Sequence, residues 1–255
     1  MSVAEIHADP TAAPTPEALK VIRDMLPDNH RDSAYRRYKD IVTALAANRR
    51  LLEIGAGRRP LLTAEEIAQQ AIRYTANDIV AGELERIPFP VDKAVFDSCG
   101  EVPAGLAGRF DVICSKMVQE HVSDGGRFYS NILGLLSDGG VALNFHPTLY
   151  SPPFLINRAF PEQVTRTVLQ FFKPERGSDG APKFPATYEL CYSSVETERA
   201  IRQIGFSAVH IIPFYHHEYF AGIPGLRVLD DAVSTWAQRR DVRLLSSYAY
   251  TIVVK

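Results

Sequence analysis

The sequence has few cysteines, no long apolar run and no large excess of charge of either sign. Cys99, Cys114 and Cys191 lie far apart, without the spacing of a metal site or a disulfide framework. No stretch approaches the roughly 18 apolar residues of a membrane span, and the first residues lack a basic start followed by an apolar segment. We therefore expect small buried thiols in a reducing, cytoplasmic compartment, with neither export nor membrane insertion.

The charge balance argues against nucleic acid as a partner. The 255 residues include 28 Lys and Arg against 30 Asp and Glu, which gives a formal net charge of -2. No overall field therefore draws the chain toward phosphate backbones. The hydrophobic share of 46% is ordinary for a globular protein, and it excludes a disordered or collagen-like chain.

Strand and helix patterns alternate through most of the chain. Residues 1–17 mix Ala, Pro, Thr and acids and predict a flexible arm, whereas residues 18–255 predict a single domain. The expected strands are 51–54, 73–77, 94–96, 110–115, 141–145, 208–214 and 247–254, and the expected helices are 16–26, 32–47, 61–70, 126–136, 195–204 and 227–239. Strands that are apolar on both faces and separated by helices predict a parallel sheet covered on both sides.

Two later segments have distinctive composition. The segment from Pro147 to Pro185 is rich in proline and aromatic residues and is too long for a plain connection. We expect residues 147–192 to form an inserted cap over the carboxyl edge of the sheet, outside the cofactor site, where it would set specificity. The last expected helix has an apolar face formed by Leu229, Ala232, Val233 and Trp236.

The most informative residues are 51–60, LLEIGAGRRP. A short apolar strand runs into Gly55 and Gly57, which let the backbone approach a ligand closely. The dinucleotide fingerprint needs a third glycine where Pro60 stands. Glu53 places a carboxylate at the strand tip, which repels a pyrophosphate and attracts a cationic group. The pattern weakens a nicotinamide interpretation and favours a positively charged or sugar-like ligand.

Acids also follow the next two expected strands. Asp78 comes 21 residues after Gly57, where a carboxylate in α/β nucleoside sites accepts hydrogen bonds from both ribose hydroxyls. Asp97 and Ser98 close the third strand, and Asp97 can accept from an adenine amino group while Ile79 packs against the ring. These residues predict a nucleoside pocket at the carboxyl edge of the sheet.

This ordered set resembles a class I S-adenosylmethionine-dependent methyltransferase. The resemblance covers residues 51–255 and includes residues 110–115, FDVICS, followed by the pair Glu120-His121. It implies an α/β fold: a Rossmann-like seven-stranded, mostly parallel sheet with helices on both faces, an antiparallel last strand, N-terminal helices and the cap after the fifth strand. It further implies that S-adenosylmethionine is bound by Glu53, Gly55, Ala56, Gly57, Asp78, Ile79, Asp97, Ser98 and Ser115. The chain departs from the family at Arg58-Arg59, where small residues are frequent.

A narrower resemblance concerns the region after the fifth strand. The stretches SPPF at 151–154 and KFPATY at 183–188 resemble bacterial methyltransferases that tailor glycans or small molecules. This implies a small-molecule or glycan acceptor and methylation of a hydroxyl oxygen by in-line displacement. We predict that the chain binds S-adenosylmethionine and its demethylated product at micromolar affinity or better, and does not bind NAD comparably.

Removing a proton from a hydroxyl acceptor calls for a base at the same edge. His121 follows the fourth expected strand and His146 the fifth, so both are candidate catalytic residues. His216 and His217 are adjacent, and adjacent residues on a strand point to opposite faces, so the two cannot readily bind one ion. No metal-ligand spacing accompanies them, so we assign no metal.

Two other functions stay open on the sequence. One is a non-catalytic nucleoside-binding or scaffold protein of the same fold, and the weaker one is a nicotinamide-dependent oxidoreductase. A scaffold has no need of a long aromatic cap or of histidines at the reacting edge. The sequence therefore favours the enzyme.

Overall fold

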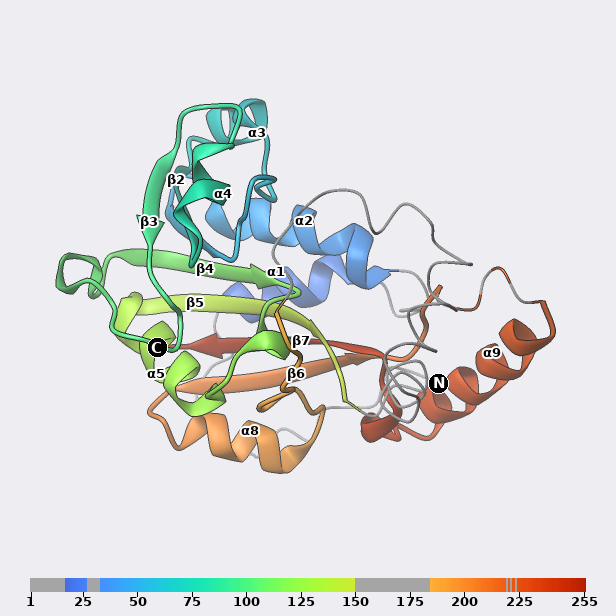
Figure 1. The fold of residues 1–255 in the computed structure, drawn as a ribbon. Coiled ribbons are helices and arrows are strands. Elements are labelled where there is room, and N and C mark those ends of the chain that lie inside the picture. The colour runs from blue at the N-terminus through green and yellow to red at the C-terminus, as the bar shows by residue number, and fades with distance from the viewer. Residues whose placement is uncertain (1–16, 27–32, 150–183, 219, 221, 223) are drawn as a thin grey trace.

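Seven strands form one sheet in the order β3-β2-β1-β4-β5-β7-β6 (Figure 1). The computed structural model describes residues 17–26, 33–149 and 184–255, apart from 219, 221 and 223. The predicted arm, all but its last residue, and most of the predicted cap lie outside the described residues. The strands are β1 (Arg50–Ile54), β2 (Arg73–Asp78), β3 (Asp92–Val95), β4 (Phe110–Lys116), β5 (Leu136–Pro147), β6 (Ala208–Phe214) and β7 (Tyr248–Val254).

The strand directions confirm the predicted Rossmann-like sheet. Strands β3, β2, β1, β4 and β5 pair in parallel, whereas β7 runs antiparallel to both β5 and β6. The carboxyl ends of β1 to β4 therefore meet at one edge of the sheet, which is where ligands bind in open α/β sheets.

Helices cover both faces of the sheet, as predicted. The helices are α1 (Glu17–Met25), α2 (Ser33–Ala46), α3 (Ala64–Gln69), α4 (Ala81–Glu85), α5 (Gly125–Leu135), α8 (Val195–Arg202) and α9 (Pro224–Arg239), with short 3-10 turns η1 (Ala104–Leu106), η2 (Gln119–His121) and η4 (Arg243–Leu245). Helices α1 and α2 lie on one face, and α5 and α8 on the other (Figure 1). None of the helices in the described ranges combines the length and apolarity needed to cross a membrane.

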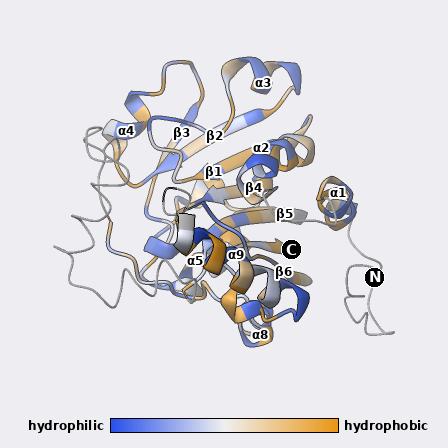
Figure 2. Ribbon diagram, turned by 90° about the vertical axis from the view of Figure 1, so that its right-hand side faces the viewer, coloured by the Kyte–Doolittle hydropathy of each residue, from blue (hydrophilic) through white to orange (hydrophobic). Residues whose placement is uncertain are grey.

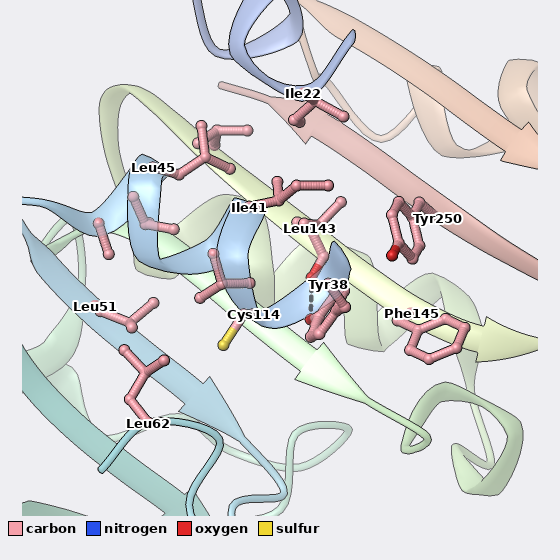
Figure 3. Packing of buried hydrophobic residues seen from close by; sticks show 14 of the residues in the cluster. Ile22, Tyr38, Ile41, Leu45, Leu51, Leu62, Cys114, Leu143, Phe145 and Tyr250 are labelled. Carbon is pink, nitrogen blue, oxygen red and sulfur yellow. Dashed lines mark hydrogen bonds between the residues drawn. The ribbon is translucent and has the colours of Figure 1, made fainter. Parts of the chain in front are cut away.

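Helix α2 anchors the first face through a buried tyrosine. Tyr38 is fully buried among Ile41, Leu143 and Phe145 (Figure 3). Its hydroxyl donates to the carbonyl of Leu143 at 2.8 Å and of Ser115 at 2.7 Å. A buried hydroxyl needs such partners. Tyr38 therefore fastens α2 to β4 and β5.

Helix α3 begins later than the expected residue 61. Thr63 caps it: its side chain accepts from the N–H of Glu66 at 3.2 Å, and the Glu66 carboxylate accepts from the N–H of Thr63 at 2.8 Å. This capping box satisfies two free N–H groups and sets the first turn. Figure 2 shows α3 partly in blue, the hydrophilic colour, and none of its residues is buried.

Helix α9 exists as expected, but its apolar face points outward. Leu229 and Trp236 are 62% and 53% exposed. The side that faces the protein carries Asp230, Ser234 and Ala237, which are buried. On this inward side, Oδ1 of Asp230 lies 3.2 Å from the Nε2 atom of His217.

Candidate active site

A cavity of about 260 Å³ lies at the carboxyl ends of β1 to β4; we call it the strand-end cavity. Six of the predicted site residues line it, namely Gly55, Asp78, Ile79, Asp97, Ser98 and His121. The other lining residues are Ile54, Asn77, Phe96, Cys99, Met117, Val118, Val122, Ser123 and Phe184. The parallel order of the strands thus brings the predicted nucleoside pocket together.

The turn after β1 requires its glycines. Gly55 and Gly57 have φ angles of 72° and 55°, a region that side chains disfavour. A Cβ atom on Gly55 would overlap the side chain of Val118. The backbone N–H of Ala56 donates to the carbonyl of Asn77 at 2.8 Å, which ties the turn to the tip of β2. A ligand can therefore reach the turn's backbone directly.

Asp78 is held by backbone groups and keeps acceptor capacity. Its Oδ2 accepts from the N–H of Gly57 at 3.0 Å and its Oδ1 from the N–H of Val80 at 2.9 Å. Each carboxylate oxygen has two lone pairs, so each can accept one more hydrogen bond. Two adjacent ligand hydroxyls match this arrangement. Gly57 does not line the cavity itself but fixes Asp78.

The Asp97 turn is positioned by α5. Oδ1 of Asp97 accepts from the N–H of Cys99 at 2.9 Å. The side-chain amide of Asn131 donates to the carbonyls of Ser98 at 2.8 Å and Gly100 at 3.0 Å. These bonds hold the Asp97 carboxylate at the cavity. The Cys99 thiol donates to the carbonyl of Asp124, so this end of the cavity lies beside the segment that ends at residue 124.

Glu53 lies beneath the glycine turn, not in the cavity. It is only 5% exposed and accepts from the N–H of Leu61 at 2.9 Å and from the hydroxyl of Tyr74. Burial raises the pKa of its carboxyl to about 7. Its Oε2 atom therefore holds residue 61 against β1 and β2, and Glu53 does not line the strand-end cavity.

The unusual Arg58 is engaged by a neighbouring acid. Its Nε and Nη2 atoms donate to the two carboxylate oxygens of Glu83 in α4, at 2.6 and 2.8 Å. The pair is a bidentate salt bridge. Arg58, which stands where small residues are frequent in the family, is therefore held beside the glycine turn by Glu83.

His121 lies at the edge of the strand-end cavity. Its Nδ1 lies 3.1 Å from the carbonyl oxygen of Pro185. A carbonyl only accepts, so Nδ1 carries the proton and the lone pair is on Nε2. Nε2 is 3.9 Å from Oε1 of the buried Glu120, whose pKa burial raises to about 8. The side chain of His121 is partly exposed and lines the cavity.

His146, unlike His121, is fully buried and does not line the cavity. It is 0% exposed, with Nδ1 3.0 Å from the Pro147 carbonyl and Nε2 2.9 Å from the Thr251 hydroxyl. Burial lowers its pKa to about 4. Both ring nitrogens are used and the residue does not line the cavity, so the structure corrects its assignment as a candidate base.

Two more predicted binding residues lie behind the cavity lining. Ser115 is buried at the end of β4, and its hydroxyl donates to Oδ1 of Asn144 at 2.8 Å. Ala56 is buried within the glycine turn. Their side chains support the cavity's framework and are not part of its lining.

The adjacent histidines contact α9. His216 Nε2 is 3.3 Å from Oε1 of Gln238, and His217 Nε2 is 3.2 Å from Oδ1 of Asp230. Among the residues that the structure describes, no three His, Cys, Asp or Glu side chains come close enough to hold a metal ion.

Sequence reasoning missed several cavity residues, above all Phe184. Met117 and Val118 come two and three residues after the predicted fourth strand, 110–115, so their position was a usable indication. Cys99 directly follows the predicted site residue Ser98, so its position was a usable indication as well. Phe184 has no local indication, because its neighbour Pro185 is 64 positions from its partner His121.

Comparison with known proteins identifies the family. Residues 28–210 match the family described as Methyltransferase domain, and the chain belongs to that family. A S-adenosylmethionine-dependent methyltransferase from Archaeoglobus fulgidus has a TM-score of 0.51 and 16% identity, with 88% of this chain and 97% of that chain covered. No curated protein gives a significant match.

Two further solved structures have the same fold. A methyltransferase in complex with the Trm112 activator from Haloferax volcanii has a TM-score of 0.54 and 14% identity, covering 87% of this chain and 91% of that one. A phosphoethanolamine N-methyltransferase from Haemonchus contortus, bound to S-adenosylhomocysteine, has a TM-score of 0.51 and 15% identity, covering 93% and 52%. At these identities the likeness concerns the fold.

The chain is thus a Rossmann-like methyltransferase, and the cofactor to test against its cavity is S-adenosylmethionine, whose demethylated product the Haemonchus contortus enzyme binds. The described residues fit this cofactor. Gly55, which has no side chain, lines the cavity, and Asp78 keeps free lone pairs facing it. The nicotinamide interpretation is set aside.

Proposed function

We propose that this methyltransferase transfers a methyl group to a hydroxyl of a small-molecule or glycan acceptor, with the cofactor in the strand-end cavity. The observation that carries the proposal is that Gly55, Asp78, Asp97 and His121, from four separate segments, line one cavity. S-adenosylmethionine, when bound, supplies an electrophilic methyl group on a positively charged sulfur. The chain's own tasks are to bind, to orient and to remove a proton.

The cofactor-binding roles follow the contacts of each residue. Asp78 accepts from the ribose hydroxyls through its two free lone-pair positions. Asp97 and Ser98 take the adenine end, with Ile79 against the ring. The backbone at Gly55 receives the methionine end. Gly57 and Glu53 act from behind the lining, by holding Asp78 and residue 61 respectively.

His121 takes the acceptor's proton at Nε2. Its Nδ1–H group is committed to the Pro185 carbonyl, so the ring presents a basic nitrogen in a fixed orientation. A hydroxyl becomes a strong nucleophile only as it loses its proton. A base at the cavity edge therefore favours a hydroxyl acceptor.

Calorimetry with S-adenosylhomocysteine tests the cofactor placement. We expect saturable binding at micromolar dissociation constants or below, and no comparable heat with NAD. Asp78→Asn removes a charged acceptor, and hydrogen bonds to charged groups contribute about 1.5–3 kcal/mol each, so affinity should fall at least about tenfold.

Asp92→Asn is the matched control, because Asp92 is exposed at the start of β3 and away from the cavity. It should bind as the parent does. Equal affinity for S-adenosylhomocysteine in both variants would place the cofactor elsewhere.

A further inference from the structure

Helix α9 exposes an apolar stripe, formed by Val228, Leu229, Ala232, Val233 and Trp236. The four large side chains of the stripe are between 38% and 71% exposed, and Ala232 is exposed among them. The spacing i, i+1, i+4, i+5, i+8 places all five on one face of the helix. Four of the ten large apolar side chains that are exposed in the described chain therefore lie together. Clustered apolar exposure of this kind marks an interaction surface.

The other side of α9 is polar and faces the protein. Oδ1 of Asp230 lies 3.2 Å from Nε2 of His217, and Nε2 of His216 lies 3.3 Å from Oε1 of Gln238. Ser234 is buried on this side. A surface helix usually turns its apolar stripe toward the core. In α9 the polar side takes that place, so the apolar stripe is left available to a partner.

Helix α9 lies at the edge of the sheet that carries the strand-end cavity. Strand β6 runs parallel to β5, because both are antiparallel to β7. Helix α9 follows β6 and precedes β7, so it stands at the edge where β4 and β5 end (Figure 1). A partner bound to the apolar stripe would therefore be held at the carboxyl edge.

The stripe ends in positive charge. Arg239 and Arg240 are exposed and follow Trp236 by three and four residues, which places them on the same face. Of the two acids in α9, Asp230 is buried. Asp231 lies 3.8 Å from an arginine in the preceding turn, which balances its charge. The outward face thus combines apolar side chains with two arginines, and its complement is a surface that is apolar and anionic.

A second copy of the chain complements this face poorly. The first turn of α9 carries no acidic residue, so antiparallel pairing of two α9 helices offers Arg239 and Arg240 no carboxylate there. Parallel pairing would set the same arginines against each other. An anionic surface can contact both.

We propose that α9 docks on an anionic phospholipid bilayer, with the apolar stripe at the boundary between headgroups and acyl chains and Arg239 and Arg240 against lipid phosphates. A helix with one apolar face and basic residues at its rim lies in the plane of the membrane interface. Tryptophan is enriched at this depth, because its ring is apolar and its N–H group is polar. This docking needs no membrane-spanning segment, and it does not depend on the identity of the methyl acceptor.

The fluorescence of Trp236 tests the proposal directly, because Trp236 is the only tryptophan in the chain. Vesicles of phosphatidylcholine and phosphatidylserine in equal parts should shift its emission to the blue. Vesicles of phosphatidylcholine alone should bind about 30-fold more weakly, which is about 1 kcal/mol for each arginine converted at 1.4 kcal/mol per tenfold. High salt should also weaken binding. An emission maximum that does not move with the anionic vesicles would overturn the proposal.

Two variants that keep the tryptophan locate the contact. Leu229→Ser should weaken binding to the anionic vesicles about 10- to 150-fold, which is the burial of one leucine side chain, about 1.5–3 kcal/mol, converted in the same way. The double variant Arg239→Gln, Arg240→Gln should weaken it about 30-fold. Thermal unfolding should match the parent, since all three side chains are exposed.

Matched controls separate α9 from the rest of the surface. Val195→Ser removes an exposed apolar side chain at the start of α8. The double variant Arg49→Gln, Arg73→Gln removes the same charge from exposed positions at the amino edge of the sheet. Both should bind the anionic vesicles as the parent does.

Two other outcomes would overturn the proposal. If the α9 variants bind the anionic vesicles as tightly as the controls, the membrane contact lies elsewhere. If light scattering without vesicles shows a dimer that Leu229→Ser converts to a monomer, the stripe is an interface between copies of the chain.

Discussion

The two edges of the sheet use aspartate in opposite ways. At the amino edge, Asp111 of β4 accepts from the Nε, Nη2 and backbone N–H groups of Arg50 at 3.0, 2.6 and 2.9 Å, and from the Ser137 hydroxyl at 2.9 Å. These bonds hold the pKa of its carboxyl well below the usual range. At the carboxyl edge, Asp78 accepts from two backbone N–H groups and lines a cavity.

This difference shows how one residue type completes its hydrogen bonds within the protein at one edge and lines a cavity at the other. A carboxylate surrounded by side-chain donors has its hydrogen bonds completed by folding. A carboxylate oriented by backbone groups keeps lone pairs for a ligand. The direction of the parallel strands decides which edge becomes the site, because the loops that follow the strands converge there.

The largest expected effect is at His121. His121→Asn keeps a donor for the Pro185 carbonyl but has no basic nitrogen. Turnover of a hydroxyl acceptor should fall about 10²–10⁴-fold, while affinity for S-adenosylhomocysteine stays near that of the parent. The measurement is methyl transfer to a panel of phenols, sugars and hydroxy acids.

His210→Asn serves as the control, since His210 lies on β6 at the far side of the sheet. It should keep full turnover. Full activity in His121→Asn would remove the base and leave orientation as the catalytic device.

Gly55→Ala should disturb the carboxyl edge next most strongly. The positive φ angle costs an alanine about 1–2 kcal/mol, and overlap with Val118 adds about 1–3 kcal/mol. We expect lower stability in urea denaturation and weaker binding of S-adenosylhomocysteine. Gly82→Ala should be harmless, because a Cβ atom there meets no atom within 4 Å. A Gly55→Ala variant as stable as the parent would refute the steric argument.

Glu53 is an intermediate case, a carboxyl at the carboxyl edge that is buried and used for structure. Its folded-state pKa of about 7 exceeds the ordinary value of 4.5, so the folded state retains a proton that the unfolded chain releases. Its contribution to stability is present below about pH 4.5 and is lost as the pH rises to 7, a change of about 3 kcal/mol.

Urea denaturation at pH 5 and pH 7.5 measures this loss. Glu53→Gln should flatten the profile relative to the parent, leaving the slope that Glu120 contributes in the same direction. An unchanged slope in Glu53→Gln would show that Glu53 is ionised in the folded protein.

The smallest effect is expected at the amino edge. Asp111→Asn weakens a partly exposed ion pair, and solvent screens such pairs, so the free energy of unfolding should fall by about 1 kcal/mol. The loss should shrink in high salt. Affinity for S-adenosylhomocysteine should not change, and a binding defect would end the contrast between the edges.

Much of the lining of the strand-end cavity was predictable because each of its parts is local. Gly55 and Gly57 signal a turn by their conformational freedom, and Asp78 and Asp97 stand where their own strands end. Because these strands run parallel, their carboxyl ends lie at one edge of the sheet, and this brings the glycine turn and the two aspartates together. The expected strands 73–77 and 208–214 differ from β2 and β6 by at most one residue, since apolar runs bounded by turns need no tertiary information.

The sequence by itself determined the alternation of strands and helices, the turn that only glycine tolerates and the acids at successive strand ends. Tertiary structure alone decided that His121 faces the cavity while His146 is buried against Thr251, and that Glu53 points into the protein. It also brought Phe184 to His121 and turned the apolar face of α9 outward. The physical reason is that strand and turn propensities act between near neighbours, whereas burial and hydrogen-bond partners depend on residues brought together only when the sheet closes.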